Sequence, residues 1–186
     1  MKRIIAVTGM TSRVLVWIGG TLIILSALTV TFDVITRKLF NFSIGGADEL
    51  SGYAFAIATT FGLAFALFER AHIRVDALHN LFPAPLKTVA DFVGIILLAG
   101  FAGVVCTMAW DLVADTLQYN SKSITPMRTP LAIPQIPWLA GWIFFCFSAV
   151  LVIVAALWAL IKRDMVTVNQ LIGAKTIDEQ IEDETV

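Results

Sequence analysis

The chain has 186 residues, of which 58% are hydrophobic and 15% are charged, and its formal net charge is −1. A soluble domain of this size could not bury so much apolar surface, so the composition excludes an ordinary soluble globular protein. The net charge gives no indication of a nucleic-acid partner, and we predict none.

Four long stretches contain no charged residue, and they occupy residues 14–32, 50–68, 92–110 and 129–161. Each has at least the roughly 18 to 20 residues that a helix needs to cross a hydrocarbon core of about 30 Å. We therefore predict an all-α membrane protein whose single domain, residues 1–186, has four transmembrane helices. The predicted spans are about 14–36, 49–69, 91–112 and 137–162, and residues 163–186 form a cytoplasmic tail. The first span has no cleavage pattern after it, so we interpret it as a retained signal anchor.

Positive charges are distributed unevenly among the segments that connect the spans. The N-terminal segment, the second connection and the C-terminal segment together carry nine Lys and Arg residues, whereas the first and third connections carry four. Positive residues favour the cytoplasmic side, so both termini are predicted to be cytoplasmic. Residues 33–49 and 111–130 are then predicted to face outward.

The first connection contains two polar features. Asp33 and Arg37 are four residues apart, within reach of each other if the helix continues. After the helix-breaking pair Gly45 and Gly46, Asp48 and Glu49 begin the next span. These carboxylates have two interpretations, because they would interact favourably with the helix dipole and could also contact a partner at the outer membrane surface.

The second span carries small residues at every fourth position, in two rows. One row is Gly52, Ala56, Thr60 and Ala64, and the other is Ala54, Ala58, Gly62 and Ala66. Small residues at this spacing allow helix backbones to approach closely in lipid, so we expect this helix to be packed on two sides. The alternative is that Gly and Ala are merely frequent in membrane spans.

The second connection contains the two histidines of the chain, in a short amphipathic segment between the second and third spans. If the segment is helical, Glu69, His72, Asp76 and His79 lie near one face, a spacing that could hold a metal. The interleaved Arg70 and Arg74 instead suit a segment at the cytoplasmic membrane surface. We predict no metal site there.

The third connection and the spans themselves offer little chemistry. Prolines 126, 130, 134 and 137 predict a structured outer loop around Arg128, with the fourth span beginning near Pro137. Cys106 and Cys146 lie inside spans and are interpreted as packing residues. No nucleophile with a base, no phosphate loop and no ionisable residue at mid-span is found, so we predict neither an enzyme nor a cofactor.

Several short motifs, taken in order, resemble one family. They are Asp33 to Arg37 (DVITR), Phe40 and Asn41, Ala47 to Leu50 (ADEL), and Ala71 to Asp76 (AHIRVD). Their order and spacing are similar to the small membrane subunit, the DctQ family, of tripartite ATP-independent periplasmic (TRAP) transporters. Gly45 and Gly46 depart from that pattern, because many relatives carry a bulky aromatic residue there.

The resemblance implies a scaffold subunit of a sodium-driven system that imports an organic acid anion across the bacterial inner membrane. Its partners would be a large TRAP membrane subunit, a periplasmic substrate-binding protein and the lipid bilayer. We predict partner contacts at Arg37, Asp48, Glu49 and Arg128, helix packing at Gly52, Ala56, Thr60 and Gly62, and a cytoplasmic interface anchor at His72, Arg74 and Asp76. The alternatives are a stand-alone four-helix membrane scaffold or small channel and, third, a metal-dependent membrane enzyme.

Overall fold

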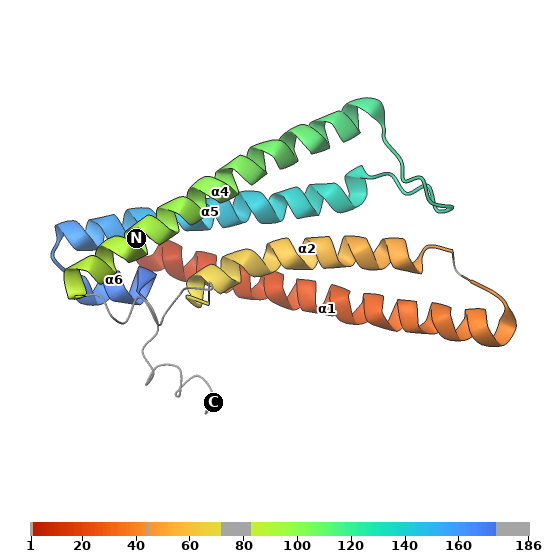
Figure 1. The fold of residues 1–186 in the computed structure, drawn as a ribbon, viewed down its shortest axis with the longest axis horizontal. Coiled ribbons are helices and arrows are strands. Elements are labelled where there is room, and N and C mark those ends of the chain that lie inside the picture. Colours follow the sequence, from red (N-terminus) through yellow and green to blue (C-terminus); the bar gives the residue numbers. More distant parts are fainter. Residues whose placement is uncertain (1, 44, 72–82, 174–186) are drawn as a thin grey trace.

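A computed structural model describes residues 2–43, 45–71 and 83–173 (Figure 1). This part of the chain is helical, and it contains no strand beyond an isolated bridge between Lys122 and Pro130. The helices are α1 (Lys2–Phe40), α2 (Ala47–Phe68), α4 (Ala84–Tyr119), α5 (Ala132–Ile161) and α6 (Met165–Ile172). The first four are long and apolar enough to cross a membrane, which confirms the all-α class and the four candidate spans.

Two helices, α1 and α4, extend far beyond the predicted spans. Helix α1 has 39 residues, so at 1.5 Å per residue it is about 58 Å long, against a hydrocarbon core of about 30 Å. Helix α4 has 36 residues and likewise continues past the charged residue Asp111. The spans were predicted from uncharged runs, but a charged residue does not end a helix, because no backbone hydrogen bond is lost there.

Helix α5 begins at Ala132, before the predicted start near Pro137. Pro134 lies in the first turn, where the backbone N–H groups have no partner within the helix in any case. Pro137 lies inside the helix and removes one hydrogen-bond donor. Pro134 and Pro137 therefore lie within the first turns of α5 and do not precede the helix.

The four long helices form a row in which α1 packs on α2, α2 on α5, and α5 on α4 (Figure 1). We call the end that carries the connections 41–46 and 120–131 the loop end, and the end that carries the N-terminus and α6 the terminal end (Figure 1). Helix α2 thus has a neighbour on each side, as its two rows of small residues predict. Helices α1 and α4 occupy the two ends of the row.

Helix α1 approaches α2 closely at one glycine. A Cβ added to Gly19 would lie 3.0 Å from the Cα of Ala58, which is tighter than ordinary van der Waals contact. Ala54 and Ala58 are buried on the facing side of α2. Because lipid provides no hydrophobic drive between helices, such close contacts supply dispersion energy that longer side chains would prevent.

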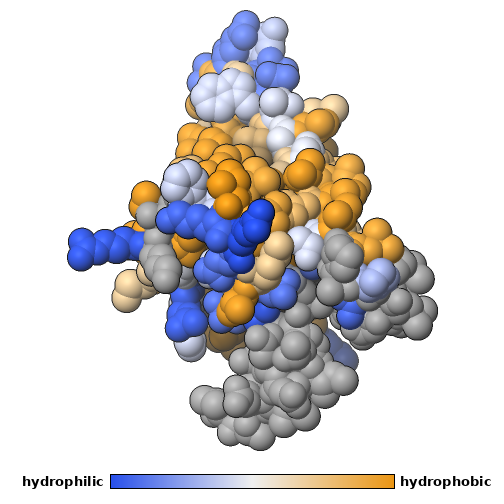
Figure 2. All heavy atoms as spheres, turned by 90° about the vertical axis from the view of Figure 1, so that its left-hand side faces the viewer, coloured by the Kyte–Doolittle hydropathy of each residue, from blue (hydrophilic) through white to orange (hydrophobic). Residues whose placement is uncertain are grey.

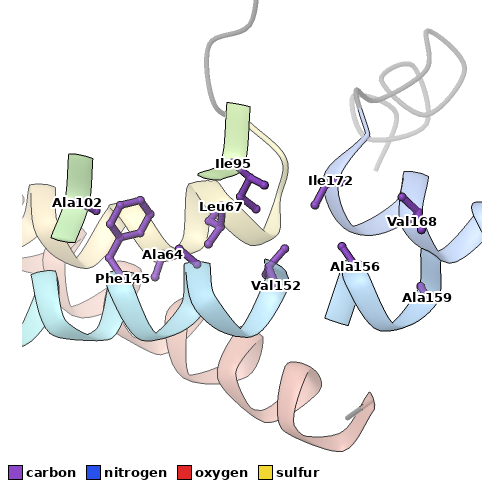
Figure 3. Packing of buried hydrophobic residues seen from close by; sticks show 11 residues of the cluster. Ala64, Leu67, Ile95, Ala102, Phe145, Val152, Ala156, Ala159, Val168 and Ile172 are labelled. Atoms are coloured by element: carbon purple, nitrogen blue, oxygen red, sulfur yellow. The ribbon is translucent and has the colours of Figure 1, made fainter. Parts of the chain in front are cut away.

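The other side of α2 meets α5 in the same way. A Cβ added to Gly141 would lie 2.4 Å from the Oγ1 of Thr60, so only glycine fits there. Beyond this contact the main core continues toward the terminal end (Figure 3). Its buried members are Ala64, Leu67, Ile95, Ala102, Phe145, Ala149, Val152, Ala156, Ala159, Val168 and Ile172.

Helix α6 lies within residues 163–186, which were predicted as a tail. Its N-cap residue Asp164 accepts hydrogen bonds from the backbone N–H and the hydroxyl of Thr167, at 3.1 Å and 2.6 Å. Val168 and Ile172 are each 1% exposed and belong to the core. The first part of this segment is therefore folded back onto the bundle, mainly against α5.

Gly19→Leu should lower the stability of the chain by about 1–3 kcal/mol, because the added side chain has no room against Ala58. The matched control is Gly20→Leu, where an added Cβ meets nothing within 4 Å. Thermal unfolding in a mild detergent measures both variants. Equal melting temperatures for the two would contradict the packing of α1 on α2.

Candidate partner-binding site at the loop end

Glu49 connects two segments at the loop end. It lies in the first turn of α2 and accepts a hydrogen bond from the Tyr53 hydroxyl at 2.6 Å. Its second carboxylate oxygen accepts a hydrogen bond from the hydroxyl of Thr125, which belongs to the loop between α4 and α5. The bond from Thr125 joins α2 to that loop, and the bond from Tyr53, within α2, holds the carboxylate in position.

The loop between α4 and α5 is ordered by its own hydrogen bonds. The backbone N–H of Ser123 donates to the carbonyl of Thr129 at 2.9 Å, and that of Leu131 donates to Ser121 at 3.1 Å. At the tip, the Arg128 N–H donates to the Thr125 carbonyl at 3.1 Å and closes a β-turn. This hairpin-like loop confirms the prediction that the proline-rich connection is structured.

A second contact joins this loop to the one between α1 and α2. A Cβ added to Gly46 would lie 1.8 Å from the Sδ of Met127, so the methionine side chain covers the glycine. Gly45, beside it, has a φ of 75°, which favours glycine. Gly46 therefore leaves space that the Met127 side chain fills. We call the contacts of Glu49 with Thr125 and of Gly46 with Met127 the loop junction.

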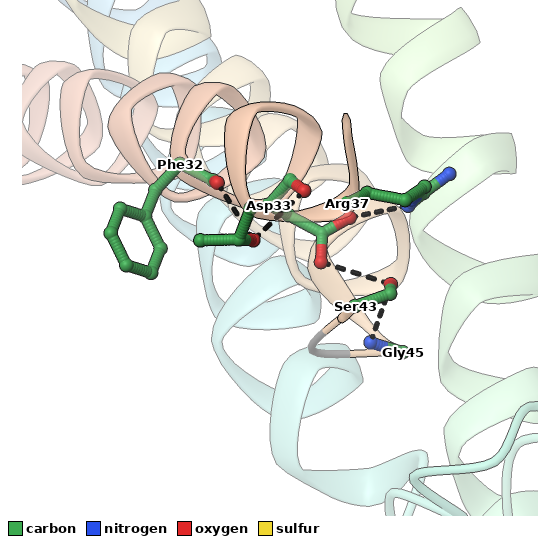
Figure 4. Close-up of polar contacts among 6 residues, drawn as sticks. Phe32, Asp33, Arg37, Ser43 and Gly45 are labelled. Atoms are coloured by element: carbon green, nitrogen blue, oxygen red, sulfur yellow. Dashed lines mark hydrogen bonds and ion pairs between the residues drawn. The ribbon is translucent and has the colours of Figure 1, made fainter. Parts of the chain in front are cut away.

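Asp33 organises the end of α1 (Figure 4). Its carboxylate pairs with the guanidinium of Arg37, as the four-residue spacing predicts, and accepts a hydrogen bond from the Ser43 hydroxyl at 3.0 Å. Ser43 in turn accepts from the backbone N–H of Gly45 at 3.2 Å. The Asp33 side chain is 2% exposed, and a buried carboxylate needs such partners to offset its lost hydration.

The four predicted partner-binding residues have different positions. Glu49 is committed to the loop junction, and Arg37 pairs with Asp33 while its side chain stays 56% exposed. Asp48 and Arg128 are exposed, and no ion pair involves either of them in the described part of the chain. Asp48, Arg128 and part of Arg37 therefore present charges at the loop end that could contact another protein.

The four predicted packing residues also differ. Thr60 is buried against Gly141, Ala56 and Gly62 are half-buried, and Gly52 is exposed with nothing within 4 Å of an added Cβ. The sequence analysis missed Gly19 and Gly141, the glycines that approach α2 from its two neighbours. Spacing within α2 could not identify them, because they lie on other helices.

The predicted cytoplasmic anchor, His72, Arg74 and Asp76, lies outside the described residues, as does His79. Within residues 2–43, 45–71 and 83–173 no group of three or more potential metal-ligating side chains is found. Cys106 and Cys146 are free thiols that are half-buried in the apolar packing of α4 and α5.

Comparison with known proteins assigns the family. Residues 26–163 match the family described as "Tripartite ATP-independent periplasmic transporters, DctQ component". The chain belongs to the DctQ family. The match covers α2, α4, α5 and residues 26–40 of α1, so the elements that build the loop junction lie within it. The family is described as a component of a transporter, which assigns this chain to transport.

Sequence similarity to a TRAP transporter permease agrees with this assignment. Over 71 residues the chain is 27% identical to the sialic acid TRAP transporter permease protein SiaT of Haemophilus influenzae (strain 86-028NP). That alignment covers 38% of this chain and 12% of the permease. The aligned part of this chain therefore corresponds to a small part of that larger protein.

Glu49→Ala and Thr125→Val should each lower the melting temperature in detergent, because each variant removes the hydrogen bond between Glu49 and Thr125. The loss in the double variant should be smaller than the sum of the two single losses, since both substitutions remove this shared contact. Asp48→Ala, in the same helical turn but exposed, is the control and should have little effect. Losses that simply add would show that Glu49 and Thr125 do not interact.

Proposed function

We propose that this chain is the small integral-membrane scaffold subunit of a sodium-driven TRAP transporter. The complete system would import an organic acid anion and would include a large membrane subunit and a periplasmic substrate-binding protein. Membership of the DctQ family supports the transporter, and the open row of helices supports the role of scaffold.

The observation that carries the scaffold proposal is the small buried fraction of α1. Only 6% of the most apolar 18-residue stretch of α1 is buried inside the chain, compared with 39% of the corresponding stretch of α5. Ile24, Leu28 and Phe32 follow one another every fourth residue and are 59–63% exposed. Such a surface must be covered by lipid or by another membrane protein, and we assign part of it to the large subunit.

The apolar interior of the chain argues against transport by this subunit alone. Residues 14–32, 50–68, 92–110 and 129–161 contain no Asp, Glu, Lys, Arg or His. Carriers place ionisable groups or broken helices near the membrane midplane, where an ion or polar substrate must be solvated. The transport path is therefore assigned to the large subunit.

Charge distribution supports an orientation in the bacterial inner membrane. The terminal end would be cytoplasmic and the loop end periplasmic, because the segments at the terminal end carry more Lys and Arg. Asp48, Arg128 and Arg37 would then face the periplasm and contact the binding protein or the large subunit. His72, Arg74 and Asp76 would hold the connection after α2 at the cytoplasmic surface.

The substrate is proposed only as an organic acid anion. The name of the similar permease includes sialic acid, but this chain matches a small part of that protein. The other two components would bind the substrate and would therefore determine the selectivity of the system.

Asp48→Asn combined with Arg128→Gln should reduce uptake severalfold in cells that contain the complete system, with an unchanged amount of the chain in the membrane. Both side chains are exposed and outside the loop junction, so the fold should be preserved. The deficit should narrow as ionic strength rises, because salt screens contacts between exposed charges.

Arg3→Gln, at the terminal end, is the matched control and should leave uptake unchanged. Normal uptake by the double variant would show that Asp48 and Arg128 make no contact that transport requires. Uptake that does not require this chain at all would contradict the proposed function itself.

A further inference from the structure

At the terminal end, an arginine follows the C-cap residue of each of two helices. Arg70 follows α2 with a φ of 54°, and Arg163 follows α5 with a φ of 58°. This left-handed conformation favours glycine or asparagine, and asparagine does occupy it after α1 and α4, at Asn41 and Asn120. The backbone conformation itself does not favour arginine at these two positions.

The side chain of Arg70 has a partner within the chain. Its guanidinium donates a hydrogen bond to the backbone carbonyl of Asn169, in the last turn of α6, at 3.3 Å. A cation at a helix C-terminus interacts favourably with the free carbonyls there. Arg70 therefore holds α6 against the end of α2.

Arg163 is different, because no ion pair involves it or its neighbour Lys162 within residues 2–43, 45–71 and 83–173. Both side chains are exposed. The adjacent carboxylate of Asp164 is engaged by Thr167. Lys162 and Arg163 outnumber the one adjacent carboxylate, that of Asp164, so the turn between α5 and α6 carries a net positive charge.

Exposed apolar side chains precede and follow these cations in the chain. Trp158, Met165 and Val166 are 53%, 49% and 68% exposed. The Lys162 Nζ lies 5.2 Å from the centroid of the Trp158 ring, which places the ammonium at the level of that aromatic side chain. Figure 2 looks onto the terminal end, where hydrophilic side chains gather beside hydrophobic ones.

We propose that Lys162 and Arg163 bind the phosphate of an anionic phospholipid in the leaflet at the terminal end, with its acyl chains against Trp158, Met165 and Val166. Charge complementarity favours an anion, and the exposed apolar side chains favour one that carries hydrocarbon over a soluble anion. Tryptophan next to lysine is typical of the membrane interface. This inference requires the chain to lie in a bilayer but does not depend on which solute is transported.

The test measures lipid retained by the full chain, purified in a neutral detergent with whatever partner accompanies it, by native mass spectrometry. Cardiolipin is the anionic probe and phosphatidylcholine the neutral one. Arg163→Gly should lower cardiolipin retention about fivefold, the effect of one cation near a membrane surface, and leave phosphatidylcholine unchanged. Its melting temperature should be equal or higher, since glycine suits the left-handed backbone, so unfolding would not explain the loss.

Lys38→Gln is the control, because Lys38 is an exposed cation in the last turn of α1, at the loop end, and has no assigned contact among the described residues. It should retain cardiolipin like the unaltered chain. The proposal would be overturned by full retention in Arg163→Gly, by an equal loss in Lys38→Gln, or by displacement of the lipid with inorganic phosphate. None of these outcomes depends on uptake, so this proposal and the proposed function can fail separately.

Discussion

The arrangement of the chain depends on how closely α2 approaches its two neighbours. Gly19 leaves room for Ala58 on one side, and Gly141 leaves room for Thr60 on the other. Helices in lipid gain no hydrophobic stabilisation from associating, so contact at short range is what holds this row together. The row places α1 at one end, where it leaves most of its surface for other molecules.

The loop junction follows from that packing. Because α5 lies beside α2, the loop that precedes α5 reaches the first turn of α2, where Thr125 meets Glu49 and Met127 covers Gly46. Asp33 orders the other loop through Ser43. The exposed charges of Asp48 and Arg128 are therefore carried by segments fixed to the helix row, as a docking surface requires.

Sequence reasoning was successful where the determining residues are close together in the chain. The uncharged runs predicted the four long helices, and the spacing of Asp33 and Arg37 predicted their ion pair. It failed where the outcome depends on distant residues, as for Gly46 with Met127 and for Gly141 with Thr60. The fold of α6 was also missed, although Asp164 followed by Thr167, with Val168 and Ile172 at helical spacing, is a local signal of a capped amphipathic helix.

The central claim is that this chain functions as a non-catalytic subunit beside a larger membrane protein. The most direct test is to tag its C-terminus, purify it gently from native membranes and identify the accompanying proteins by mass spectrometry. The account predicts one large polytopic partner in equal amount. Recovery of the chain alone as a stable oligomer, under conditions that preserve other membrane complexes, would contradict the claim and favour a stand-alone scaffold or small channel.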